Sequence, residues 1–295
     1  MTAVNPTIAS APRRTSALRR LFRDRLALAA AIILALIVLA ALFAPWLVPN
    51  DPYLTNTRLR MLPPVWEARG QWKYVLGTDG LGRCMLSRLL YGTQATLLMG
   101  LASTIIGGGI GLVVGLLAAY YKKLDGWLMQ LSDVLLSFPA ILLGLAFAAA
   151  VGPGMTAVIV ALSVATIPTV TRVTRGSALV VMGQDFIEAG RSIGLSDTTI
   201  LIRYLALNCV SSVFVYLTLR FGQVILLGSA LSFLGLGAQP PVAELGTMAS
   251  AGRNELFLAP HIAVIPSLVI VIMVLCANVL GDALRDLLDP RLRNG

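Results

Sequence analysis

Residues 188–208, EAGRSIGLSDTTILIRYLALN, form a polar, helix-forming segment between two hydrophobic runs that are long enough to cross a bilayer. Glu188 begins the segment, Gly194 follows six positions later, and an apolar run with one basic residue, Arg203, comes after the glycine. A loop that only joins two membrane helices needs no such pattern. We therefore interpret the segment as a surface that another polypeptide binds on one side of a membrane.

The composition indicates a polytopic membrane protein. Of the 295 residues, 57% are hydrophobic and 13% are charged, whereas a soluble globular domain carries about 25% charged residues. The net charge of +9 does not indicate a nucleic-acid partner, because the positive charge is mostly arginine at the ends of apolar runs. The three cysteines lack CxxC spacing and there is a single histidine, so we expect neither a metal site nor a catalytic set of side chains.

Six hydrophobic runs fit a hydrocarbon core about 30 Å thick, which takes roughly 20 residues of helix. We therefore expect an all-α integral membrane protein with six transmembrane helices. The first run is predicted to be an anchor, since its apolar stretch exceeds the roughly 7–15 residues of a signal sequence. The fourth contains Pro168 and is expected to be short and broken. The predicted spans are 26–48, 93–121, 127–151, 155–171, 209–232 and 261–280.

The basic residues predict the orientation. Fifteen of them flank the side that carries both termini, seven flank the other side, and Arg220 lies within a run. Cytoplasmic loops are enriched in Lys and Arg, so both termini and the 188–208 segment are predicted to be cytoplasmic. The expected organisation is a basic tail 1–25, an anchor helix 26–48, an extracytoplasmic loop 49–92 ending in an interfacial helix, a five-helix core 93–281 with a cytosolic loop 176–208, and a tail 282–295.

Small residues predict two further features. Gly107, Gly111 and Gly115 recur every four positions in the second run, which favours close helix packing in lipid. In the cytosolic loop, Gly194 suits the left-handed position that ends a helix. Ser196 can cap the next helix, so we expect two short helices joined by a glycine turn, with the second continuing into the fifth span.

The 188–208 segment resembles the EAA loop of bacterial ATP-binding-cassette (ABC) importer permeases. Glu188, Ala189 and Gly194 match the loop's pattern, and Gly190 replaces its third small residue. Ala206 and Leu207 stand where the family usually has Leu-Pro.

Four other segments are similar to the dipeptide, oligopeptide and nickel permeases, with Cys84 in place of a common aspartate in the first; beyond the third, Leu245 stands where a tryptophan usually follows the glutamate. They are LGTDGLGRCMLSRLLYG (76–92), SDVLLSFPAILL (132–143), LSFLGLGAQPP (231–241) and GDALRDLLDPRL (281–292).

The resemblance implies a type I ABC importer permease of the bacterial inner membrane, of the second-permease, dipeptide- or glutathione-type. It implies a homologous second permease, two cytosolic ABC ATPases and an extracytoplasmic substrate-binding protein as partners. No Gly-Lys pair occurs in the sequence, so a phosphate-binding loop is excluded. ATP and Mg are expected on the ATPases and no cofactor on this chain. The implied ATPase interface comprises Asp185, Glu188, Ala189, Gly190, Ser192, Gly194, Ser196, Asp197 and Arg203.

Two further sets of residues are predicted to serve transport. A charge within a span is costly and tends to face a cavity or a partner, which places Arg220, with Asp133 and Gln223, along the translocation path. A guanidinium can bind a peptide carboxylate through two hydrogen bonds, although a structurally paired arginine is an equal alternative. The polar, glycine-rich segment 231–260 is expected to shape an outer gate and to contact the binding protein, with an inert loop as the alternative. Its candidate residues are Gly235, Gly237, Gln239, Pro240 and Pro241.

The leading interpretation is import of di- or oligopeptides. Glutathione, nickel and a metal-chelating, opine-like ligand remain alternatives, because the same subunit architecture serves all of them. An intramembrane enzyme needs convergent ionisable residues within the spans, and the single histidine argues against it. A channel needs no such organised cytosolic segment.

Overall fold

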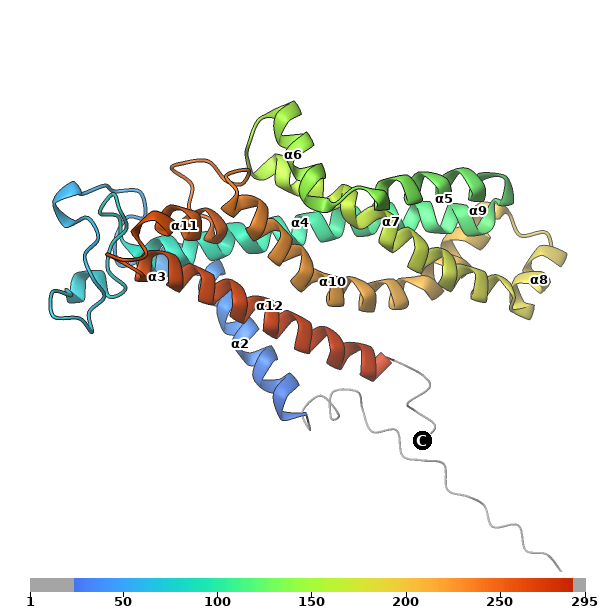
Figure 1. Ribbon diagram of the computed structural model, residues 1–295. Coiled ribbons are helices and arrows are strands. Elements are labelled where there is room, and N and C mark those ends of the chain that lie inside the picture. The colour runs from blue at the N-terminus through green and yellow to red at the C-terminus, as the bar shows by residue number, and fades with distance from the viewer. Residues whose placement is uncertain (1–23, 289–295) are drawn as a thin grey trace, which may run out of the picture.

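Helices account for the regular structure of residues 24–288, the part of the chain that this computed structural model describes (Figure 1). Within those residues the pairing outside helices is one bridge between Thr78 and Cys84, so the all-α prediction is confirmed. The elements are α2 (Arg25–Leu42), α3 (Ala44–Leu47), short 3₁₀ turns at Thr57–Leu59 and Trp72–Tyr74, α4 (Met85–Tyr120), α5 (Lys122–Ser137), α6 (Ala140–Val151), α7 (Met155–Met182), α8 (Asp185–Ser192), α9 (Asp197–Thr199), a π-helix (Ile200–Ala206), α10 (Leu207–Phe233), α11 (Leu245–Gly252), a 3₁₀ turn (Arg253–Glu255) and α12 (His261–Leu288).

The described part of the chain has five helices that are long and apolar enough to cross a membrane, or six spans if one bent pair counts as a span. Figure 1 shows the long loop before α4 at one end of the bundle and α8 at the other. We call these the loop end and the α8 end. The five helices are Arg25–Leu42, Met85–Tyr120, Met155–Met182, Asp197–Phe233 and His261–Asp286.

The predicted third span, 127–151, is not one straight helix. Instead, α5 and α6 meet at an angle of 90°. Phe138 precedes Pro139, and a proline ring disfavours helical backbone at the residue before it. Phe138 accordingly has φ −89° and ψ 125°. The prediction of a continuous helix is wrong because mean hydropathy does not register this break, although the proline stands in the sequence.

The most extensive helix packing joins α4 to α7. A Cβ added to Gly107 or Gly115 would lie 2.6 Å from a backbone oxygen of α7, and one added to Gly111 would lie 2.7 Å from the Val170 side chain. The glycines therefore allow the two backbones to approach, as their spacing predicted. The predicted break at Pro168 is wrong: α7 continues through it to Met182, and its packing on α4 extends on both sides of the proline.

Two predicted boundaries also move. The expected interfacial helix before residue 93 forms the first turns of α4, which starts at Met85. Ser87, Arg88 and Gly92 are buried in those turns, so one side of the segment packs against the rest of the protein. The predicted cytosolic loop 176–208 begins inside α7, because residues up to Met182 are helical.

At the two ends of the sequence, α2 packs against α12, and the buried side chains on α2 are alanines, namely Ala27, Ala30 and Ala41. The predicted anchor 26–48 corresponds to α2 and α3. Of the predicted tail 282–295, residues up to 288 belong to α12. The rest of that tail, and residues 1–23 of the predicted N-terminal tail, lie outside the described residues.

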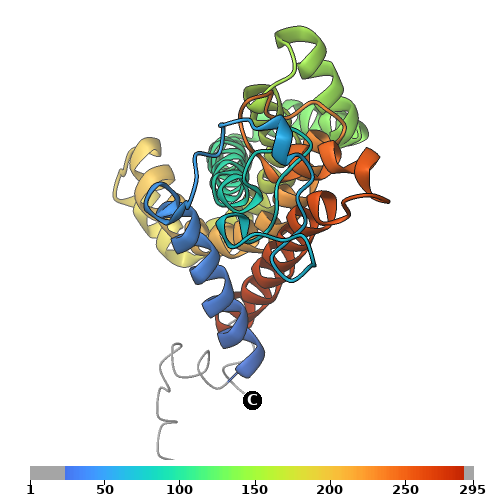
Figure 2. The same ribbon diagram turned by 90° about the vertical axis from the view of Figure 1, so that its left-hand side faces the viewer.

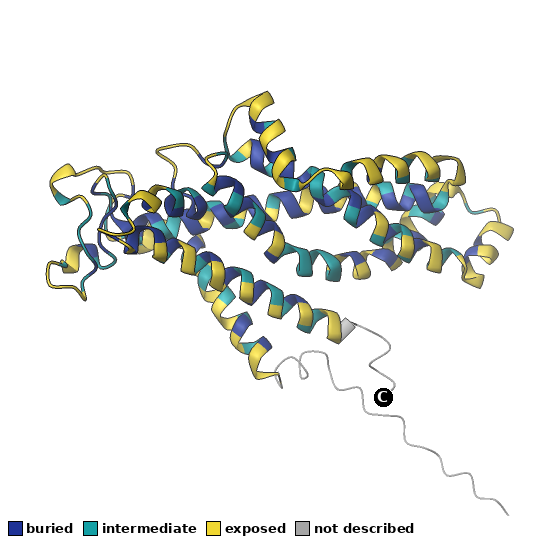
Figure 3. Ribbon diagram, in the orientation of Figure 1, coloured by how far each residue is buried: buried dark blue, intermediate teal, exposed yellow. Residues whose placement is uncertain are grey.

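The core follows α4. Viewed from the loop end, α4 is seen nearly end-on among the other helices (Figure 2). Figure 3 shows buried residues concentrated along α4, α7 and α10, whereas α2, α6 and α8 carry mostly exposed residues. The helix at the α8 end is therefore exposed over most of its surface.

Candidate functional site

The α8 end is built from one short helix and a capped turn. Gln184, with extended backbone (φ −89°, ψ 144°), precedes α8. Asp185 and Glu188 lie in its first turn and Arg191 in its last. These charges stabilise the helix because they are opposite in sign to the dipole at each end. The local sequence alone thus favours a helix with these bounds.

A glycine ends α8 with a defined turn. Gly194 has φ +81°, its N–H donates to Arg191 O (3.0 Å), and the N–H of Leu195 donates to Gly190 O (3.1 Å). These two bonds define a Schellman motif. The Leu195 side chain covers Gly190, where an added Cβ would meet its Cδ1 at 3.1 Å. The sequence predicted a left-handed glycine here, and the structure has it.

The second short helix is capped as expected. Ser196 Oγ accepts a hydrogen bond from Thr199 N at 3.4 Å and lies 2.8 Å from Thr199 Oγ1. The chain then continues through the π-helix Ile200–Ala206 into α10. Leu207, which stands where importer permeases usually have proline, has ordinary helical backbone (φ −61°, ψ −35°). The irregular turn therefore precedes that position, and π-helical turns are frequent at functional sites.

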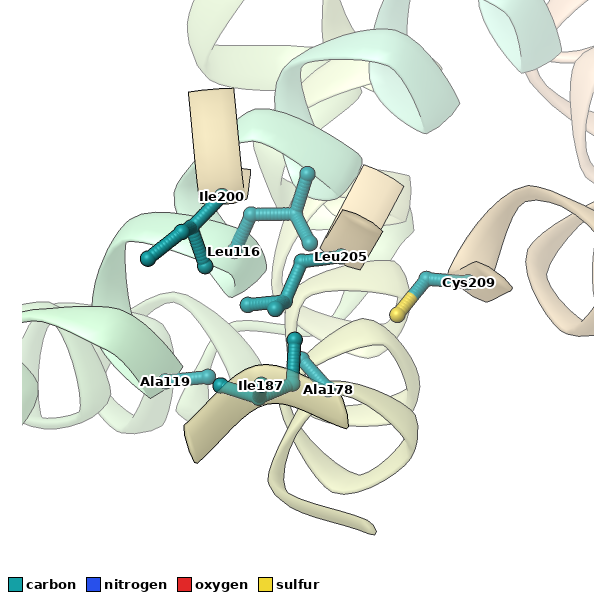
Figure 4. Close-up of a cluster of buried hydrophobic side chains, with 7 residues drawn as sticks. All are labelled: Leu116, Ala119, Ala178, Ile187, Ile200, Leu205 and Cys209. Atoms are coloured by element: carbon teal, nitrogen blue, oxygen red, sulfur yellow. The ribbon is translucent and has the colours of Figure 1, made fainter. Parts of the chain in front are cut away.

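A buried apolar cluster fixes α8 to the bundle (Figure 4). Ile187 is the residue of α8 that enters it, and its side chain is 2% exposed. Full burial of an isoleucine side chain stabilises by about 1.5–3 kcal/mol. The cluster draws on α4, α7, α8, the π-helix and α10 and comprises Leu116, Ala119, Ala178, Ile187, Ile200, Leu205 and Cys209.

Aromatic residues add a second set of contacts. Tyr120, the last residue of α4, donates its hydroxyl to Asp197 Oδ1 at 2.6 Å. The Arg191 guanidinium lies 5.6 Å from the centre of the Tyr120 ring, and Phe186 stacks on Tyr204 at 6.2 Å. Sequence analysis did not identify either tyrosine, because nothing local relates residue 120 to residue 197. Tyr120 therefore links α4 to both short helices.

The outward face of α8 is free of cover within the described residues. Of the nine predicted interface residues only Gly190 is buried. Ile193, which was not predicted, is 77% exposed beside Gly194. The exposed members are Asp185, Glu188, Ala189, Ser192, Gly194, Ser196, Asp197 and Arg203. The arrangement is a short ledge, anchored through Ile187, that exposes three carboxylates, one arginine, small residues and the apolar side chain of Ile193.

The predicted path residues lie on neighbouring helices. Arg220 Nη1 donates to Gln223 Oε1 at 2.5 Å, and Nη2 donates to Thr169 Oγ1 at 3.3 Å. Asp133 pairs with Arg172, a residue that sequence analysis left out of this set. Thr169 and Arg172 are three residues apart on α7 and so share one face of that helix. The structure therefore places Asp133 of α5 and Arg220 of α10 each against α7, through Arg172 and Thr169 respectively.

The predicted gate residues form the loop between α10 and α11 at the loop end. Gly235 has φ +88°, and Gln239 Nε2 donates to Gly235 O (3.2 Å) and Gly237 O (2.9 Å). Gly237 is buried against Ser232, whose Oγ would lie 2.1 Å from an added Cβ. Pro240 and Pro241 are exposed. Side-chain hydrogen bonds within the loop thus support its conformation.

Charged residues that sequence analysis missed connect this loop to α4. Arg88, 5% exposed, lies 3.4 Å from Asp79 Oδ2 and donates to Pro241 O at 3.4 Å. Glu244 is fully buried, accepts from Thr96 Oγ1 at 2.9 Å and caps α11. These contacts join residues about 150 positions apart, which no local pattern indicates. Within the described residues no group of three or more His, Cys, Asp and Glu side chains is placed to hold a metal.

Residues 111–294 match the family described as the binding-protein-dependent transport system inner membrane component. The chain belongs to this family. A second family, described as the N-terminal TM domain of oligopeptide transport permease C, matches residues 14–64 of the permease.

Curated relatives cover almost the whole permease. It is 42% identical over 282 residues to the glutathione transport system permease protein GsiD of Pectobacterium atrosepticum, which covers 94% of this chain and 90% of the relative. It is 43% identical over 281 residues to GsiD of Escherichia coli, with 93% and 89% covered. It is 40% identical over 275 residues to a protein of Brucella abortus named for a peptide transport system permease, with 93% and 91% covered.

Solved structures share the fold. The permease superposes on a chain of the inward-facing MetNI methionine ABC transporter with a TM-score of 0.57 and 23% identity, over 70% of this chain and 98% of that chain. For an amino acid ABC transporter crystallised with histidines the TM-score is 0.52 and the identity 18%, over 67% of this chain and 92% of that chain. The type I ABC importer permease fold is thereby confirmed. The permease is the non-catalytic membrane component of an importer that works with a substrate-binding protein and a separate ATPase subunit.

Proposed function

We propose that this permease moves di- or oligopeptides across the bacterial inner membrane by alternating access. Its relatives include a protein named for a peptide transport system, and its N-terminal residues match the oligopeptide permease family. In this proposal the permease pairs with a homologous second permease, and two ATPases carry ATP and Mg on the cytosolic side.

The observation that carries the coupling role is the α8 end. Ile187 is buried against four other elements, while Glu188, Ala189 and Ile193 are exposed on the opposite side of the same short segment. Because the ledge is anchored on one side and exposed on the other, it can dock in a groove of the ATPase subunit. Closure of the ATPase pair then moves the ledge, and with it the attached helices, as a rigid body.

The orientation follows from the arginines. Both termini are expected in the cytosol because basic residues gather on that side. One membrane crossing by α2 brings the chain to the loop end, and α4 returns it to the α8 end. The α8 end is therefore assigned to the cytosol, and the loop between α10 and α11 is assigned to the gate and the binding protein.

Cysteine cross-linking in the assembled importer tests the docking role. Ile193→Cys is expected to cross-link to the ATPase subunit. Leu54 lies at the loop end and is also accessible, being 67% exposed, but Leu54→Cys is expected not to cross-link. The native cysteines are buried and serve as the unreactive background. Cross-linking from residue 54 and none from residue 193 would refute both the docking role and the orientation.

Glutathione is the second candidate substrate, because two relatives at 42% and 43% identity are named for its transport. Uptake of labelled glutathione and of labelled dipeptides by the same cells, with and without this permease, separates the two. Loss of dipeptide uptake alone on deletion supports the main proposal, and loss of glutathione uptake alone supports the alternative.

A further inference from the structure

Two ion pairs of different character join α5 to α7. Arg172 contacts Asp133, and these side chains are 53% and 59% exposed. One turn further, Arg175 donates from Nε and Nη2 to the two oxygens of Asp125, each at 2.6 Å, and these side chains are 31% and 30% exposed. The second pair has the two-bond geometry of a strong structural contact, whereas the first is more open.

The open pair lies at the inner end of the predicted fourth span, 155–171. Arg172 is about 26 Å from the start of α7 at a rise of 1.5 Å per residue, close to the limit of a hydrocarbon core about 30 Å thick. Both side chains are about half exposed, so water can reach them, and charges near a span favour such polar surroundings over lipid. An open cavity of about 430 Å³ adjoins them, lined by Asp125, Gly126, Met129, Asp133, Arg172 and Arg175 together with Gly176.

A row of polar side chains, which we call the polar lane, continues from this cavity along α7 away from the α8 end. Thr169 lies one turn from Arg172 on α7 and accepts a hydrogen bond from Arg220, which also binds Gln223. The lane therefore presents hydrogen-bonding groups of three helices in sequence. Its one exposed pair of opposite charges is Arg172 with Asp133.

We propose that the Arg172–Asp133 pair is a binding site for the terminal charges of a zwitterionic peptide in the translocation path. The peptide carboxylate takes the place of Asp133 on Arg172, and the peptide ammonium takes the place of Arg172 on Asp133. An exposed ion pair contributes little to stability, so exchange of partners is nearly balanced. A purely anionic or purely cationic solute leaves one of the two charges unpaired. This inference rests on the proposed function, and glutathione satisfies the same chemistry.

The pair also fits a path that does not select side chains. Every free peptide carries the two terminal charges, whatever its sequence, so a site for those charges alone admits peptides of varied composition. A guanidinium matches a carboxylate through two parallel hydrogen bonds, which orients the peptide without contact to its side chains. Arg175 and Asp125, which are already doubly bonded, remain to hold α5 to α7.

Uptake by the assembled importer tests the proposal with two substrates, a labelled dipeptide and the same dipeptide amidated at its C-terminus, each at concentrations that the wild-type importer takes up. Arg172→Gln is expected to lower uptake of the free dipeptide at least about tenfold, the effect of losing a charge-assisted hydrogen bond, and to change uptake of the amide less than about twofold. Arg175→Gln, the matched control, is expected to affect both substrates equally. Equal losses for both substrates with Arg172→Gln would show that the pair is only structural.

Thiol labelling tests the water-filled surroundings separately. A Cβ at Gly176 or at Gly109 would meet nothing within 4 Å, so a cysteine fits at either position. A charged thiol reagent is expected to label Gly176→Cys and to spare Gly109→Cys, whose neighbours Ile105, Ile106 and Val113 form an exposed apolar face. Absence of labelling at residue 176 overturns the proposal. If the wild-type importer takes up neither form of the peptide, the proposed function fails, whereas equal losses in the variant leave that function standing.

Discussion

Gly194 offers the sharpest test of how the α8 end works. Its φ of +81° costs an ordinary L-residue about 1–2 kcal/mol, and an added Cβ would meet nothing within 4 Å. The penalty is therefore one of backbone conformation and not of collision. A change of this size disfavours the native turn by about 5–30-fold, and the two hydrogen bonds of the Schellman motif depend on that turn.

The same backbone argument predicts how activity ranks among substitutions at residue 194. Gly194→Val and Gly194→Ala reorient α8 and should reduce the apparent affinity for the ATPase subunit, and peptide uptake, by up to the same 5–30-fold. Gly194→Asn should retain most activity, because asparagine tolerates the left-handed region. Gly183→Ala is the control, since Gly183 has φ −81° and its Cβ would meet only backbone oxygens at 3.7 and 3.9 Å.

The assay is ATPase-subunit binding and peptide uptake by importers with equal amounts of membrane-inserted permease. If the Asn and Val variants at residue 194 lose activity equally, the backbone argument is wrong. The loss then comes from the space that a side chain at residue 194 takes up in the docked complex. If the Val variant keeps wild-type activity, α8 orientation is unimportant for coupling.

Three further predictions concern packing and contacts. Ile187→Ala should lower the free energy of unfolding by about 2–4 kcal/mol, seen as a reduced melting temperature in detergent, whereas Ile193→Ala should leave that temperature unchanged and weaken ATPase binding. Gly111→Leu should prevent stable folding because its side chain would overlap α7, and Gly109→Leu, in open space, should fold normally; equal expression of the two would contradict the packing argument. Tyr120→Phe removes the bond to the α9 carboxylate and should cost at most about 1 kcal/mol, detected as weaker coupling of ATP hydrolysis to uptake with unchanged protein levels.

Local chemistry accounts for what the sequence predicted at the candidate site. The left-handed glycine at residue 194 and the cap at Ser196 depend on neighbours within five positions, so their residue types suffice. The glycine spacing of α4 is likewise a property of one helix face. Each of these predictions concerns a backbone requirement that only a few residue types meet.

Long-range contacts account for what it did not predict. Tyr120 meets a carboxylate 77 positions away, and Thr96 meets Glu244 across 148 positions. Hydropathy also misplaced the start of α4, because Arg88 is polar by sequence yet buried by its partners in the fold. Prolines were misjudged in both directions: Pro139 bends a predicted helix, and Pro168 leaves α7 intact because the packing of α4 supports the helix on both sides.

The shape of α4 constrains how motion at the α8 end can reach the loop end. At 36 residues it is about 54 Å long, and it contacts α8 and α9 through Tyr120 and the loop between α10 and α11 through Arg88. Its three consecutive glycines, 107–109, make an isolated helix of this sequence weak, since each costs about 1 kcal/mol relative to alanine. In the fold, Gly107 is covered by α7 and Gly108 by Leu217 of α10. The stiffness of α4 therefore depends on its two neighbours, and force applied at α8 moves α4, α7 and α10 together, not α4 alone.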